Sequence, residues 1–151
     1  RKSERTTLSE VAELYCKIYN RDNLIEILKP IFEKEPLSIE YHKFISEIPQ
    51  IKKIITTNYD RTFEKAYGDN IQIVLSKEDL IHLNAEKTTL FKIHGSFEVP
   101  NSIIITKSDY EDFFTKNKSL SFSPFFQRIQ MNTYKCKAKC VCISNRVFKC
   151  F

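Results

Sequence analysis

Short β-branched segments alternate with segments of helical periodicity in the middle of the chain, and this alternation restricts the possible folds most. Four such runs are bounded by polar residues, as buried strands usually are: 53–57, 71–75, 88–93 and 102–106. Apolar residues at helical spacing lie between them, in 60–67 and 76–80. Strands separated by helices form parallel sheets with helical crossovers. The sequence therefore predicts an α/β fold with a Rossmann-like parallel sheet.

Helical periodicity also predicts an N-terminal helical part before the first strand. Residues 8–19 form an amphipathic pattern, and Asp22 is placed to cap a second helix that Pro30 stops or kinks. A third helix is predicted between Pro36 and Pro49.

Two further helices are predicted after the last strand. Ser108 is expected to cap the first, which runs through Phe114, because Glu111 follows at capping-box spacing. Pro124 begins the second.

The composition changes near Met131. Five of the 24 basic residues and none of the 19 acidic residues lie in 131–151, so the rest of the chain is neutral and the tail carries the net charge of +5. A nucleic-acid-binding domain carries its charge on the folded face, so this distribution argues against nucleic acid as a partner. We expect two parts: a folded domain at 1–130, and a basic, cysteine-containing tail at 131–151 outside the fold.

The cysteines follow the same division as the charge. Cys16 is alone in the body, and the other four lie in the tail, at 136, 140, 142 and 150. A secreted disulfide framework would distribute its cysteines through the fold, and no apolar run is long enough to cross a membrane. We expect a cytoplasmic protein without a membrane segment, and zinc binding by the tail cysteines stays open. A first residue other than Met also suggests a segment of a longer chain.

Polar clusters follow two of the predicted strands directly. The first is IITTNYD at 54–60, and the second is LFKIHGS at 90–96. Ligands of open α/β sheets bind beyond the carboxyl ends of the strands. We therefore predict that Asn58 and His94 lie at the ends of neighbouring parallel strands and face one cleft. Gly95 allows a sharp turn directly after His94.

Each of these polar residues also has a structural interpretation. Asn58 and Asp60 are good caps for the helix that follows them. On spacing alone, a loop histidine bound to backbone is the commoner role for His94, and structural roles are favoured for His42 and His82. The body lacks the sequence patterns of a serine nucleophile, of paired glycosidase carboxylates and of a metal cluster.

The motifs TTNYD and KIHGS, followed by PNSIIITKSDYEDF, resemble the central segment of the sirtuin-like NAD-consuming family, in its bacterial-defence-type branch. The resemblance covers about 8–130. It implies that NAD is the substrate and that the complete protein is an NAD glycohydrolase, which cleaves the bond between nicotinamide and ribose. Asn58, which places the attacking water, and His94, the base on a ribose hydroxyl, would be catalytic. Thr57, Asn58, Asp60 and Gly95 would contact NAD, and no metal is implied.

The glycine content departs from the family pattern. Gly68 and Gly95 are the only glycines, so the glycine-rich turn that binds pyrophosphate in the family is missing. We therefore expect an incomplete domain that binds NAD poorly by itself. The alternative is a catalytically inactive NAD-binding or protein-interaction fragment, with a protein partner or a homo-oligomer left open. Deacylation is disfavoured relative to NAD hydrolysis, and a zinc-dependent interaction module is the weakest hypothesis.

Overall fold

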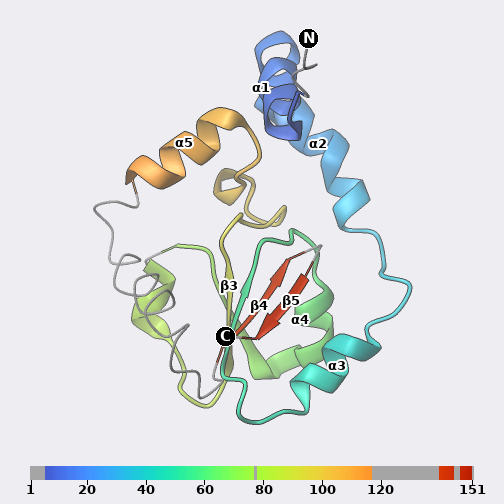
Figure 1. Ribbon diagram of the computed structural model, residues 1–151, viewed down its shortest axis with the longest axis vertical. Coiled ribbons are helices and arrows are strands. Elements are labelled where there is room, and N and C mark those ends of the chain that lie inside the picture. The colour runs from blue at the N-terminus through green and yellow to red at the C-terminus, as the bar shows by residue number, and fades with distance from the viewer. Residues whose placement is uncertain (1–5, 77, 117–139, 145–146, 151) are drawn as a thin grey trace.

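A computed structural model of the chain contains a mixed sheet flanked by helices (Figure 1). It describes residues 6–76, 78–116, 140–144 and 147–150. The strands are β1 (Lys53–Thr56), β2 (Ile71–Val74), β3 (Thr88–Lys92), β4 (Cys140–Ser144) and β5 (Val147–Cys150). Their order in the sheet is β2-β3-β1-β4-β5; the first four are parallel, and β5 is antiparallel to β4. The predicted α/β, Rossmann-like sheet is confirmed.

Five α-helices accompany the sheet in the described residues: α1 (Leu8–Tyr19), α2 (Arg21–Phe32), α3 (Glu40–Ser46), α4 (Thr62–Tyr67) and α5 (Lys107–Lys116). Three short 3₁₀ helices are η1 (Gly68–Asn70), η2 (Glu78–His82) and η3 (Pro100–Ser102). α1 packs on α2 and on α5, and α3 packs on α4 (Figure 1). The helical N-terminal part agrees with the prediction.

The start and end of α2 differ from the prediction. Asn20 caps the helix instead of Asp22, because its side chain accepts a hydrogen bond of 2.9 Å from the Asn23 amide. Asn20 has a φ of 91° and a ψ of 169°, a backbone conformation that is essentially restricted to glycine and is therefore strained in asparagine. Pro30 lies inside the helix, which continues to Phe32 and is not stopped by the proline.

Both faces of the central strands are buried, which is why their sequences are apolar without interruption. Ile54 and Leu90 are fully buried on one face, where Phe63 and Tyr67 of α4 cover them together with α3. Their chain neighbours Ile55 and Phe91 pack in a second cluster with Val74 of β2. The β1–α4–β2 connection therefore crosses over β3 and buries α4 against the sheet.

The predicted strand at 102–106 is wrong. Its backbone groups are used by side chains and a turn, so they cannot form a strand ladder. The Ile105 and Thr106 amides donate to Asp109 Oδ2 at 2.9 Å, and the Ile104 amide donates to the His94 carbonyl at 3.0 Å. The isoleucines reflect burial against α2: Ile103 is 2% exposed and packs with Ile25.

The residue that caps α5 is also different from the predicted one. Thr106 Oγ1 accepts a hydrogen bond of 3.1 Å from the Asp109 amide, and the Thr106 amide donates one of 2.9 Å to Asp109 Oδ2. This reciprocal pair is a capping box that begins two residues before Ser108. The helix predicted from Pro124 lies outside the described residues.

Part of the predicted tail lies in the sheet. β4 pairs with β1 in parallel from Lys53↔Cys140 to Thr56↔Ile143, and β5 pairs with β4. We expected 131–151 to stay outside the fold. The edge of β1 opposite β3 offers free hydrogen-bonding groups to a further strand, and β4 pairs with these groups. The domain boundary at 130 remains a prediction.

Candidate functional site

The two polar clusters follow neighbouring parallel strands. β1 and β3 pair from Lys53↔Thr89 to Thr56↔Lys92, and the Ile93 amide donates to the Thr56 carbonyl at 3.0 Å. Asn58 and His94 each lie two residues beyond this last pair. The prediction that they follow the carboxyl ends of neighbouring strands is therefore confirmed.

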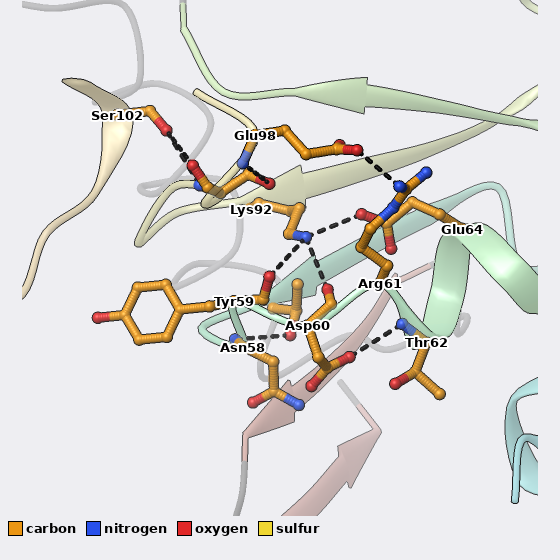
Figure 2. A network of polar contacts seen from close by, with 11 residues as sticks. Asn58, Tyr59, Asp60, Arg61, Thr62, Glu64, Lys92, Glu98 and Ser102 are labelled. Carbon is orange, nitrogen blue, oxygen red and sulfur yellow. Dashed lines mark hydrogen bonds and ion pairs between the residues drawn. The ribbon is translucent and has the colours of Figure 1, made fainter. Parts of the chain in front are cut away.

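Asn58 lies just after β1 at this edge. Its backbone amide donates to Thr56 Oγ1 at 3.0 Å (Figure 2). Thr57, between them, is half-buried. The side-chain Oδ1 of Asn58 is buried and has no hydrogen-bond partner in the part of the chain that the structure describes. A buried amide oxygen without a donor is costly, so this atom is suited to accept a hydrogen bond from a ligand or water.

Asp60 has a structural role that Asn58 lacks. Its Oδ1 accepts a hydrogen bond of 3.0 Å from the Thr62 amide, at the start of α4 (Figure 2). This contact forms a turn just before α4, whose N-cap residue Arg61 has no side-chain capping bond, so neither Asn58 nor Asp60 is the predicted helix cap.

His94 is half-buried between two tyrosine rings. Its ring centroid lies 5.3 Å from that of Tyr110, nearly perpendicular, and 6.3 Å from that of Tyr59. Burial lowers the pKa of the imidazole from its ordinary value, because a charged ring loses hydration there. The ring is therefore predominantly neutral at pH 7 and able to accept a proton.

Tyr59 and Gly95 bring the two clusters and the 102–106 segment together. The Tyr59 hydroxyl donates to the Ile104 carbonyl at 2.6 Å, and burial raises the pKa of this phenol well above its ordinary range. Gly95 has a φ of 85°, and a Cβ at this position would overlap the Ser102 carbonyl. The predicted sharp turn after His94 is present, and the close approach of the two backbones explains the glycine.

Lys92, the last residue of β3, belongs to this site although no sequence motif singled it out. Its side chain has no exposed surface, and its ammonium donates to the Tyr59 carbonyl at 3.2 Å and to the Asp60 carbonyl at 2.7 Å (Figure 2). It also forms an ion pair of 2.8 Å with Glu64 of α4. A lysine that ends an otherwise buried strand was a signal in the sequence, since lysine is almost never fully buried without a partner.

A cleft of about 240 Å³ lies beside this network, between the end of α2 and the start of α4. Phe32 and Lys34 line one side, and Asp60 and Arg61 line the other. Asn58 and His94 do not line it, so the prediction that these two side chains face one cleft remains a prediction.

The other two histidines lie elsewhere. His42 of α3 packs edge-on against Phe63 with the centroids 4.6 Å apart, and burial lowers its pKa, although the Asp60 charge opposes this. His82 is exposed in η2. Within the described ranges, no group of three or more histidine, cysteine or acidic side chains is arranged to hold a metal. No helix in the same ranges is long and apolar enough to span a membrane.

Comparisons with known proteins match the segment that carries both clusters. The family model of the SIR2-like domain matches residues 52–136, more than half of the chain. The chain is 30% identical over 133 residues to the NAD(+) hydrolase ThsA of Bacillus cereus (strain MSX-D12), covering 84% of the chain and 27% of that relative. It is 27% identical over 122 residues to NAD(+) hydrolase ThsA of Cytobacillus dafuensis, covering 78% of the chain and 24% of the relative.

The chain therefore spans about a quarter of the length of these two relatives. The predicted resemblance to sirtuin-like proteins is confirmed by the family match, which includes the strands β1, β2 and β3 and the residues from Thr57 to Gly95. The chain belongs to the SIR2-like domain family.

Proposed function

We propose that the chain is the reactive part of an NAD glycohydrolase, which cleaves the bond between nicotinamide and ribose. The observation that carries this proposal is the parallel pairing of β1 with β3, after which Asn58 and His94 follow at the same edge of the sheet. The names of the similar proteins, NAD(+) hydrolases, support the choice of substrate.

The reaction breaks the C1′–N bond of the nicotinamide riboside. The bonding electrons leave with the nicotinamide, which is neutralised, and water attacks the oxocarbenium-like C1′. The products are ADP-ribose, nicotinamide and one proton. Because the leaving group is already cationic, the site needs a positioned nucleophile and a base, and no strong acid.

The proposed catalytic residues fit these two requirements. Asn58 positions the water or a ribose hydroxyl with the buried Oδ1 that lacks a partner within the described ranges. His94 takes the proton through a ribose hydroxyl, and its lowered pKa keeps the base free at neutral pH. We propose that Thr57 and Asn58 contact NAD directly, and that Asp60 and Gly95 shape the backbone on which it lies.

The test is nicotinamide release by the protein in its full natural length. Asn58→Ala and His94→Ala should each lower kcat by roughly 10²–10⁴-fold, the range of a lost general base or positioned nucleophile. His82→Ala, which changes an exposed histidine of η2, is the matched control and should retain wild-type kcat. Undiminished release by His94→Ala would remove the histidine from the mechanism.

The alternative proposal is an inactive NAD-binding or protein-interaction fragment. The chain has only two glycines, Gly68 after α4 and Gly95 beside the histidine, and neither belongs to a glycine-rich phosphate turn. If the full-length protein binds NAD in calorimetry and releases no nicotinamide, this alternative is established. The glycohydrolase proposal also includes a cytoplasmic location and a role in bacterial defence. Cell fractionation tests the location, and phage challenge of cells that carry the full-length protein tests the role in defence.

A further inference from the structure

The buried Lys92–Glu64 pair stands out because a buried ion pair is a poor way to stabilise a core. The Lys92 side chain is 0% exposed and that of Glu64 is 8% exposed. Well-packed apolar residues of similar volume usually stabilise a core at least as well as such a pair. Packing alone therefore does not explain why a charged lysine is buried at the end of β3.

The contacts of Lys92 supply that reason. Two of its three hydrogen bonds go to the Tyr59 and Asp60 carbonyls, directly after Asn58 (Figure 2). Lys92 itself belongs to β3 and lies two residues before His94. One ammonium group therefore ties the loop that carries Asn58 to the strand end that carries His94.

Glu64 completes this arrangement from α4. Its Oε1 accepts from Lys92 at 2.8 Å, whereas its Oε2 is buried without a hydrogen-bond partner among the described residues. The carboxylate thus balances the charge of Lys92 and holds the ammonium beneath the loop. Removal of Lys92 alone would leave this carboxylate buried and unpaired, which is strongly destabilising.

We propose that Lys92, held by Glu64, is a positioning residue for NAD cleavage that sets the location of Asn58 relative to His94. This inference rests on the proposed glycohydrolase function and assigns Lys92 no contact with NAD. A misplacement of reacting groups by about 1 Å lowers rates by roughly 10²-fold. Loss of the Lys92 hydrogen bonds to the Tyr59 and Asp60 carbonyls should therefore reduce kcat by roughly that factor, with a much smaller change in KM.

The experiment separates positioning from stability with a double variant in the full natural length. Lys92→Met with Glu64→Leu replaces both buried charges by apolar side chains, so its unfolding midpoint in urea should stay close to that of the wild type. Its kcat for nicotinamide release should nevertheless be roughly 10²-fold lower. Lys29→Met is the matched control, since Lys29 forms a surface pair of 3.7 Å with Glu33, and it should retain wild-type kcat.

Hydrogen exchange provides a second measurement that does not depend on catalysis. Amides of 58–62 should exchange faster in the double variant than in the wild type, while those of β1 and β3 keep their protection. Wild-type exchange in 58–62, or faster exchange with wild-type kcat, would overturn the positioning role. If the wild-type protein releases no nicotinamide, the proposed function is overturned. If exchange in 58–62 is the same in the double variant and the wild type, the positioning role of Lys92 is overturned whatever the activity.

Discussion

At the scale of single residues, burial of the imidazole distinguishes His94 from an ordinary loop histidine. Burial beside two tyrosine rings lowers its pKa, so a proton titration followed by NMR should give a midpoint below that of an ordinary histidine. A midpoint at or above the ordinary value would contradict the burial argument and its consequence for catalysis.

The same shift links His94 to stability. Because its pKa is lower in the folded than in the unfolded chain, the folded state gains stability from neutral His94 above the unfolded pKa. This contribution is lost as the pH falls toward the folded pKa. Between pH 7 and pH 5, the free energy of unfolding should decrease more in the wild type than in His94→Gln. An equal decrease in the free energy of unfolding of both proteins would show that His94 does not cause this pH dependence.

The two glycines provide a matched pair of substitutions. Gly95 and Gly68 both have positive φ, at 85° and 54°, but only at Gly95 would a Cβ overlap neighbouring backbone. Gly68→Ala should cost about 1–3 kcal/mol, which is the cost of its backbone conformation alone. Gly95→Ala should cost at least about 3 kcal/mol, because the Ser102 backbone must also move. Urea unfolding measures both, and equal costs would contradict the close approach.

At the scale of elements, an ion pair connects α2 to the start of α5. Arg21 donates to both carboxylate oxygens of Asp109 at 3.0 and 2.9 Å and to the Ile103 carbonyl at 2.6 Å. Burial alone would raise the pKa of Asp109, but hydrogen bonds from the Ile105 and Thr106 amides and from Arg21 outweigh burial and lower it.

Asp109→Ala should therefore destabilise the fold by about 1–3 kcal/mol, because two backbone amides and an arginine lose their acceptor. The loss should be largest at neutral pH and smaller in acid. A carboxylate with a lowered folded pKa stabilises above its unfolded pKa and loses this effect as the pH falls through the folded value. Glu26→Ala, on the exposed side of α2, is the control and should change the unfolding free energy by less than about 0.5 kcal/mol. Equal losses in both variants would argue against the connection.

At the scale of the whole molecule, the open question is where the folding unit ends. The three core clusters draw their members from Ile25 to Ile105, while β4 adds to the sheet beside β1. We predict that limited trypsin digestion cuts within 131–151 before it cuts 8–116, and that the remaining body still unfolds cooperatively. If 131–151 resists trypsin, and if the body unfolds when this segment is removed, β4 and β5 belong to the folding unit.

The sequence by itself determined the three strands β1, β2 and β3, the N-terminal helical part and the motif-bearing strand ends. β-branched runs at 53–57 and 88–93 are buried on both faces in the fold, so composition alone marks them as central strands. The polar residues after them predicted that Asn58 and His94 follow neighbouring strand ends, as the register of β1 and β3 confirms. The same reasoning failed at 102–106, because isoleucines indicate burial and do not reveal that distant side chains take the backbone hydrogen bonds.

Only the tertiary structure decided which polar groups satisfy one another. Lys92, Glu64 and the Tyr59 and Asp60 carbonyls come from four positions whose distances depend on how α4 packs against the sheet. The Asn58 Oδ1, which has no partner among the described residues, and the lowered pKa of His94 arise in the same way, from the neighbours that folding supplies. Periodicity reports which face of an element is buried, because apolar burial is non-directional. Hydrogen bonds and ion pairs are directional and short-ranged, so only the folded arrangement specifies them.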